Sequence, residues 1–511
     1  MMKKWLRGLI GLSILALCGR LLGFVREILM ASKFGATEIT DAYLTTLLLF
    51  DIAIAANSSI LSGTLSYSTG IKNLSKISAS LYKIGIKLFA AVFVVALILY
   101  PLTDIIIPLI FSKSTAAAQI VIETSRLFLI LLAFLAGSGI FSALLQIKGN
   151  ITNPGKLVIF LNVSSVVFLI LFTPYFGILS LPLGLLFGGF LFFIYQIFLI
   201  GKTNFELRDN SENDKFNMYS WGTVVLLIFG NSLLPSLSGL LERYFAYSFA
   251  EGTFSHYQYA VKIIFLPLTI FSFAISTSLL PVQTKSINSG NKEEFINVTN
   301  NGILLSVITS AFFVLIFSTL SEPIIRLIYQ HGRFTLRDSA DTSLALQIMA
   351  IGLIPFLLNP VLANVFYSLG IVKKLIAINL FFILIQTGIL FFLSKIFSGI
   401  ETLTTTWVII VWINNITLVL YLIRLKHLHS YKTVFLKLLL VLLITTAMIA
   451  LGKNSIGLWS ADIFNVQNNW SLLLKIVFAG FVLLFVFCLA VYFLFRDKFN
   501  NILANLKKSN K

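Results

Sequence analysis

The sequence predicts an all-α, polytopic membrane protein with about fourteen transmembrane helices, and three observations support this fold class. The 511 residues are 58% hydrophobic and only 11% charged, and the mean hydropathy is +0.95. A soluble domain carries roughly 25% charged residues, so the chain does not belong to that class. Long apolar stretches recur along the whole chain with short polar connections between them. A β-barrel would need alternating segments of about ten residues, which the sequence lacks.

Each predicted helix is a stretch of about 20 mostly apolar residues, the length that crosses the hydrocarbon core of a bilayer. With edges uncertain by several residues, the expected spans are about 8–31, 41–66, 82–108, 121–147, 156–175, 178–201, 217–247, 254–282, 299–320, 341–368, 374–395, 403–423, 433–451 and 470–495. The first stretch begins like a signal peptide. Its apolar run continues without a small-residue cleavage site, so we expect it to be retained as the first helix.

The distribution of Lys and Arg predicts the orientation in the membrane. If the N-terminus is cytoplasmic, 25 of the 38 Lys and Arg residues fall on the cytoplasmic side, eight on the opposite side and five within spans. Cytoplasmic connections carry the excess of Lys and Arg in membrane proteins. We therefore expect both termini in the cytoplasm. The same distribution explains the net charge of +18 without a nucleic-acid partner.

An internal repeat predicts two lobes of six helices. Arg26 and Arg243 each stand nine residues before a glycine, Gly35 and Gly252, and a short polar stretch and an Ala–Tyr or Tyr–Ala pair follow each glycine. The second copy begins after an even number of spans, so the two copies run parallel, as in many transporters. The predicted organisation is an N-lobe at 1–201, a cytoplasmic linker at 202–216, a C-lobe at 217–423, two further spans within 424–495 and a basic cytoplasmic tail at 496–511.

Charged residues inside the predicted spans indicate a water-filled cavity. Arg20, Arg26 and Glu27 lie in the first span, Arg243 in the seventh and Lys262 in the eighth. A charge at the centre of a membrane helix costs at least ~2.5–3.5 kcal/mol, so such residues usually face a cavity or a partner. The spans that hold them are the first two of each half. We expect them to line one cavity with net positive charge at the lobe interface.

For several of these residues a structural role is an open alternative. Arg26 and Glu27 would form a local pair near the end of the first span, and Arg126 would extend to the membrane surface. Glu242 would either neutralise a neighbouring arginine or hold an ion or proton. Asp41, at the start of the second span, would cap that helix or take part in binding.

A cavity lined by cations favours an anionic substrate. Arginine and lysine are common ligands of phosphate and diphosphate. Large anions that must cross a membrane include lipid-linked sugars that carry a diphosphate. The four histidines are scattered at segment ends and the two cysteines lie inside apolar runs, so we expect neither a metal site nor an enzyme.

Three segments of the sequence resemble a known family. The segments "GRLLGFVREILMASKFGATEITDAY" (19–43), "YAVKIIFLPLTIFSFAISTSLLP" (259–281) and "LIYQHGRFTLRDSADTSLALQIMAIGLIPF" (327–356) are similar, in order, to the MurJ (MviN) lipid II flippases of the multidrug/oligosaccharidyl-lipid/polysaccharide exporter superfamily. The similarity covers the whole chain. The first segment is the most distinctive, and much of the remainder is generic apolar sequence.

The resemblance implies a flippase in the bacterial cytoplasmic membrane that serves cell-wall biosynthesis. Such a protein moves undecaprenyl-diphosphate-linked peptidoglycan precursor from the cytoplasmic to the outer leaflet by alternating access. Arg20, Arg26 and Lys262 stand at positions that bind the diphosphate in the family, and Asp41 matches a family acidic residue. Glu242 stands where some members place an acidic sodium ligand. Arg243, from the repeat, completes the expected binding set.

The sequence also departs from the family pattern. Gln386 and Leu390 stand where polar residues complete the sodium site, so an acidic ligand is missing. No cofactor is expected, and sodium, protons and the membrane potential stay open as driving forces. A flippase for another lipid-linked oligosaccharide is the nearest alternative, followed by a cation-coupled drug exporter and a non-transporting membrane scaffold.

Overall fold

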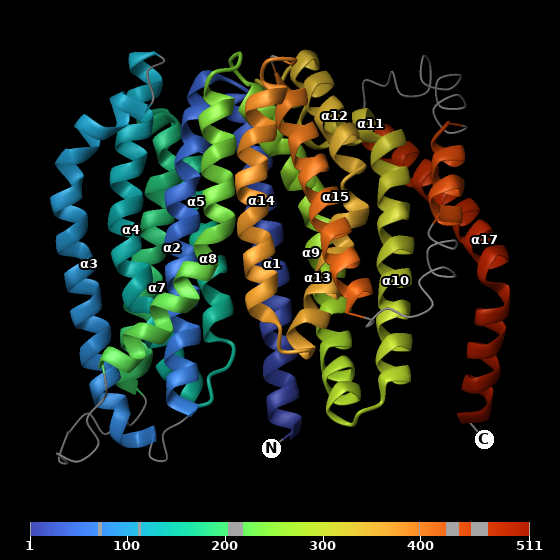
Figure 1. The fold of residues 1–511 in the computed structure, drawn as a ribbon. Helices are drawn as coiled ribbons and strands as arrows, with labels where there is room; N and C mark the ends of the chain where they lie inside the picture. Colours follow the sequence, from blue (N-terminus) through green and yellow to red (C-terminus); the bar gives the residue numbers. More distant parts are fainter. Residues whose placement is uncertain are drawn as a thin grey trace. The chain divides into compact units, whose positions relative to one another are not determined.

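The computed structural model describes residues 2–69, 74–110, 114–202, 218–397, 399–425, 439–450 and 469–509. All regular elements in these ranges are helices (Figure 1). The chain divides into two compact units, which are residues 1–255 with 332–334, and residues 256–331 with 335–511. The lobe boundaries expected from the sequence, at 201 and 217, stay a prediction.

The first unit is built from long helices and one short break. Its elements are α1 (Met2–Phe34), α2 (Glu38–Thr69), α3 (Leu74–Ile110), α4 (Thr115–Ile147), α5 (Asn153–Leu171), α6 (Thr173–Phe176), the 3-10 turn η1 (Gly177–Leu179), α7 (Ser180–Lys202) and α8 (Met218–Tyr247). Helix α4 lies at the centre, because it packs against α2, α3 and α7. Helix α8 packs against α2. Buried phenylalanines such as Phe141 and Phe193 fill the space between α3, α4 and α7.

The second unit contains most of α9 (Thr253–Asn288) and the helices that follow it. These are α10 (Lys292–Thr319), α11 (Ser321–Tyr329), α12 (Leu336–Ala350), α13 (Leu353–Ser368), α14 (Val372–Leu393), α15 (Ile400–Arg424) and α17 (Asn469–Ser509). Helix α10 packs against α13, α12 and α17, and α15 packs against α12, α13 and α14.

The prediction of an all-α, polytopic membrane protein is confirmed. Among the described residues, ten helices are long and apolar enough to cross a membrane, or eleven if one bent pair counts as a single span. That pair, α12 and α13, differs from the single helix expected at 341–368, because the two parts meet at 46°. Pro355 lies in the first turn of α13. In a continuous helix its ring would clash with the carbonyl of residue 351, so the helix breaks before it.

Glycines allow the backbones of α5 and α7 to approach each other closely. A Cβ atom on Gly184 would lie 2.6 Å from Cα of Ser165, and one on Gly188 would lie 2.6 Å from the carbonyl oxygen of Phe160. Small residues spaced four apart are the usual means by which membrane helices pack backbone to backbone. The glycines therefore fix the spacing of this helix pair.

We predict that Gly188→Ala lowers the stability of the protein by about 1–3 kcal/mol, because the added methyl group overlaps main-chain atoms that cannot move independently. Gly201→Ala is the matched control, since it lies in the same helix and its Cβ would meet nothing within 4 Å. The midpoint of thermal unfolding in detergent measures both. Equal midpoints for the two variants would show that the contact does not constrain α7.

Candidate functional site

The charges of α1 form a buried pair near the end of that helix. Arg26 Nη2 lies 2.7 Å from Glu27 Oε1, and the two residues are 7% and 3% exposed. The local pairing considered from the sequence is therefore present, but the pair is buried rather than extended toward the membrane surface. Arg20, about two turns earlier in the same helix, is exposed. Within the membrane part of α1, Arg26 is thus compensated by a carboxylate, whereas Arg20 lies on the exposed surface of the helix.

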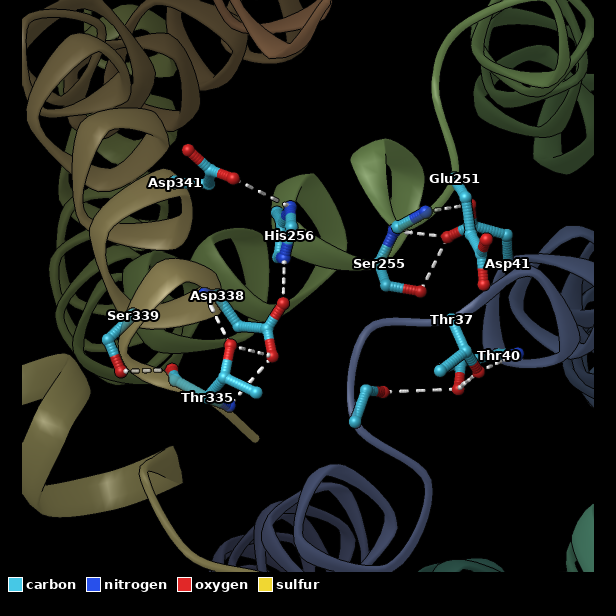
Figure 2. Close-up of polar contacts among 12 residues, drawn as sticks. Thr37, Thr40, Asp41, Glu251, Ser255, His256, Thr335, Asp338, Ser339 and Asp341 are labelled. Carbon is cyan, nitrogen blue, oxygen red and sulfur yellow. Dashed lines mark hydrogen bonds and ion pairs between the residues drawn. The ribbon is translucent and has the colours of Figure 1, made fainter. Parts of the chain in front are cut away.

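Asp41 joins α2 to the beginning of α9 within the first unit. Its Oδ2 accepts a hydrogen bond of 2.8 Å from the amide of Gly252. Its Oδ1 accepts bonds from the amide and the hydroxyl of Ser255, at 2.7 and 2.5 Å (Figure 2). The first amides of a helix have no partner inside it and attract an anion. Asp41 therefore caps α9 rather than the helix that contains it.

The start of α2 receives a reciprocal contact from the loop that precedes α9. The amide of Glu38, the first residue of α2, donates a hydrogen bond of 3.0 Å to Glu251 Oε1. Thr37 lies before this helix, and its hydroxyl accepts a 3.4 Å bond from the amide of Thr40. Each of the two helices therefore has an N-terminus that is satisfied partly by a carboxylate from the other segment.

Three glycine loops pack main chain against main chain beside these caps. Gly35, Gly252 and Gly332 have φ values of +66°, +81° and +61°, which L-residues with side chains rarely adopt. Cβ atoms on them would lie 2.9 Å from the carbonyl oxygen of Arg333, 2.6 Å from that of Ala36 and 2.2 Å from that of Ser32. The amide of Arg333 also donates to the carbonyl of Ser32 at 2.8 Å. Gly35 and Gly252, the glycines of the sequence repeat, are thus both required by backbone geometry.

Arg243 is the counterpart of Arg26 in the repeat and is also paired with a carboxylate. Its Nη2 lies 3.4 Å from Asp51 Oδ2, and Arg243 is 9% exposed while the Asp51 side chain is 55% exposed. Asp51 was not among the predicted site residues, since a contact between residues 192 positions apart has no signature in one sequence. Glu242, next to Arg243, is half-buried.

The remaining predicted residues belong to the second unit. Lys262 is half-buried in α9, and Gln386 in α14 is buried, as is Leu390 one turn later. The convergence of Arg20, Arg26 and Lys262 on one cavity stays a prediction. Among the described residues, no group of three or more His, Cys, Asp or Glu side chains is arranged to hold a metal ion.

A second polar cluster, in the second unit, was not predicted. His256 Nε2 lies 2.9 Å from Asp338 Oδ1 and its Nδ1 lies 3.9 Å from Asp341 Oδ2 (Figure 2). Asp338 also forms a capping box with Thr335 at the start of α12. The spacing of a threonine and an acidic residue three positions later is a known helix-start signal, so this part of the cluster could have been recognised in the sequence.

Arg126 was expected to extend to the membrane surface, and its contacts lie on the neighbouring helix α3. It forms an ion pair with Asp104, donates a 3.0 Å hydrogen bond to the hydroxyl of Thr103, and lies 4.4 Å from the ring centre of Tyr100. The Asp104 side chain is 58% exposed. Asp104 therefore compensates the charge of Arg126 from an exposed position on α3.

We predict that Asp41→Ala lowers stability by about 1–3 kcal/mol, because the buried amides of Gly252 and Ser255 lose their acceptor. Asp104→Ala is the control, since it removes an exposed carboxylate whose ion pair contributes about 0–1 kcal/mol. Thermal unfolding of the purified proteins in detergent gives both values. An Asp41→Ala protein that unfolds at the wild-type temperature would contradict the capping role.

The family model described as "Lipid II flippase MurJ" matches residues 30–478. A probable lipid II flippase MurJ from Buchnera aphidicola subsp. Baizongia pistaciae is 28% identical over 415 residues, which cover 77% of this chain and 79% of that protein. A second, from Buchnera aphidicola subsp. Acyrthosiphon pisum, is 25% identical over 93% of this chain and 95% of the relative.

Solved structures show the same fold. A lipid II flippase MurJ in an inward closed conformation superposes with a TM-score of 0.74 at 18% identity, over 96% of this chain and 100% of that one. A transporter of the MOP superfamily from Pyrococcus furiosus superposes with a TM-score of 0.61 at 15% identity, over 82% of this chain and 95% of that one. The family match extends over most of the sequence, and the fold agrees with it. The chain belongs to the lipid II flippase MurJ family.

Proposed function

We propose that this protein moves lipid II, the lipid-linked peptidoglycan precursor, across the bacterial cytoplasmic membrane. The observation that carries this proposal is the family match over residues 30–478. The transporter fold of the neighbouring structures supports it. The orientation with both termini in the cytoplasm is supported by the distribution of Lys and Arg in the sequence. Transport toward the outer leaflet is what the resemblance to the family implies.

The proposed headgroup ligands are Arg20, Arg26 and Lys262. A guanidinium binds two phosphate oxygens at once, and an ammonium acts as a point charge, so this combination suits a diphosphate. Arg26 is included because an ionisable residue retained within a membrane helix usually marks a substrate or ion pathway. In this role Arg26 would exchange its contact with Glu27 for the diphosphate. The mechanism is alternating access, in which the diphosphate is held by these cations while the lipid chain stays in the bilayer.

The nearest alternative is a flippase for a different lipid-linked oligosaccharide. It would use the same diphosphate chemistry and differ only in the sugar headgroup. Complementation separates the two. The wild-type gene should restore growth to a bacterial strain depleted of its own lipid II flippase, whereas failure to do so at normal membrane levels would favour the other glycan.

Within that assay we predict that Arg26→Gln abolishes rescue. Because this change leaves Glu27 buried beside a neutral side chain, the double variant Arg26→Gln/Glu27→Gln removes both charges and serves as the structural control. The double variant should reach normal membrane levels and still fail to rescue, since the diphosphate ligand is gone. Arg126→Ala, whose contacts lie on α3, should retain rescue. Growth restored by the double variant would assign Arg26 to structure alone.

We infer that protons or the membrane potential, rather than sodium, drive transport, with Glu242 as the candidate coupling group. The inference is supported by Gln386 and Leu390, which are buried and offer no carboxylate for a sodium ion. The expected result in reconstituted vesicles is lipid II translocation that is unchanged when potassium replaces sodium. Glu242→Gln should remove the response to a pH gradient. A requirement for sodium in the wild-type protein would contradict this inference.

A further inference from the structure

A cavity of about 530 Å³ lies in the first unit between α2, α3, α4 and α8. It is lined by residues within 45–49, 99–107, 121–129 and 240–244. These segments lie toward the start of α2 and α4 and toward the end of α3 and α8, so they occupy the same end of the antiparallel helices. The volume is within the range of about 300–1,000 Å³ that is typical of ligand sites.

The interior of this cavity is apolar even where its lining residues carry hydroxyl groups. The hydroxyls of Thr45, Thr46 and Thr103 donate to the carbonyls of Asp41 (2.8 Å), Tyr43 (2.6 Å) and residue 100 (2.7 Å), each in the same helix as its donor. Because these three hydroxyl groups donate within their own helices, they do not provide the cavity with the free hydrogen-bond donors that a buried water would need. A hydrocarbon chain suits such a lining.

The mouth of the cavity lies on surface that we expect to face lipid. Leu99, Ile106, Leu240 and Tyr244 both line the cavity and are 36–63% exposed. Helix α3, which supplies the first two, contains the candidate membrane span Ala79–Pro108. A molecule that reaches this opening from the bilayer is therefore a membrane lipid.

Arg243 is the charged residue in the lining of this cavity. Its distance of 3.4 Å from Asp51 is long for a charge-assisted hydrogen bond. Its Nε is buried and has no hydrogen-bond partner among the described residues. Arg243 as a whole is 9% exposed, so a phosphate oxygen can contact the exposed part of its guanidinium, and guanidinium groups bind phosphates strongly. An apolar cavity with one arginine complements a lipid with a hydrocarbon chain and an anionic head.

We propose that this cavity binds an anionic phospholipid of the surrounding bilayer, with one acyl chain inside and a phosphate oxygen at Arg243. The size of the cavity favours a single acyl chain, whereas the long polyprenyl chain of a lipid-linked glycan would extend well beyond it. The bound phospholipid is distinct from the transported lipid. The proposal therefore does not rest on the proposed function. It assigns Arg243, which the sequence placed in the expected binding set of the transported lipid, to a different lipid from Arg20, Arg26 and Lys262.

Photo-crosslinking of the full-length protein in lipid nanodiscs tests this proposal. Phosphatidylglycerol with a diazirine on its acyl chain is incorporated in one sample and the matching phosphatidylcholine in another, at the same fraction. After irradiation, mass spectrometry of peptides locates the label. Phosphatidylglycerol should label the cavity-lining peptides of α2 and α8 roughly three- to tenfold more than phosphatidylcholine, because the choline cation of phosphatidylcholine offsets the charge of its phosphate and weakens the attraction to Arg243.

Two cavity-filling variants and one charge variant make the result decisive. Thr103→Trp and Ser125→Leu fill the space from α3 and α4, and each should reduce labelling of the lining peptides. Ile98→Trp is the matched control on the exposed side of α3 and should not reduce it. Arg243→Gln should remove the preference for phosphatidylglycerol. Lining peptides labelled equally in the filled variants and the wild type would overturn occupancy by a chain. Equal labelling by the two lipids, which share the phosphate group, would overturn the preference for a net negative headgroup and with it the choice of an anionic phospholipid.

Discussion

Three of the embedded arginines can be accommodated in an apolar chain because each has a carboxylate beside it. Arg26 is paired with Glu27, Arg243 with Asp51 and Arg126 with Asp104. An uncompensated charge at these positions would carry the full cost of leaving water, whereas a hydrogen-bonded pair offsets much of that cost. The pairs differ in exposure. Arg26 and Glu27 are both buried, while the side chains of Asp51 and Asp104 are more than half exposed.

The second constraint concerns helix beginnings, where amides lack partners inside the helix. Asp41 and Glu251 satisfy such amides reciprocally at the starts of α9 and α2. The adjacent loops approach so closely that Gly35 and Gly252 have no room for a side chain. The repeat of an arginine followed nine residues later by a glycine therefore has a physical basis, since the arginine is paired inside a helix and the glycine permits the loop contact.

Much of the fold follows from local properties of the sequence. The long helices α4 and α10, for example, follow from apolar stretches that are long enough to cross a bilayer, and the break before α13 coincides with Gly352 and Pro355. The contacts of the candidate site were harder to predict from the sequence. Arg26 and Glu27 are neighbours in the chain, so their pair could be considered in advance. The pairing of Arg243 with Asp51 and of Asp41 with Ser255 joins residues about 200 positions apart, and no local pattern encodes such contacts.

The central proposal is that Arg20, Arg26 and Lys262 recognise the diphosphate of lipid II. The most direct measurement is the affinity of the purified protein for lipid II and for a polyprenol without phosphate, with each cation changed in turn to glutamine. If this proposal holds, every substitution weakens lipid II binding by roughly ten- to a hundredfold, the range for a charge-assisted hydrogen bond, and leaves the weak polyprenol binding unchanged. Lipid II binding that survives the loss of Lys262, or that equals polyprenol binding in the wild type, would contradict it.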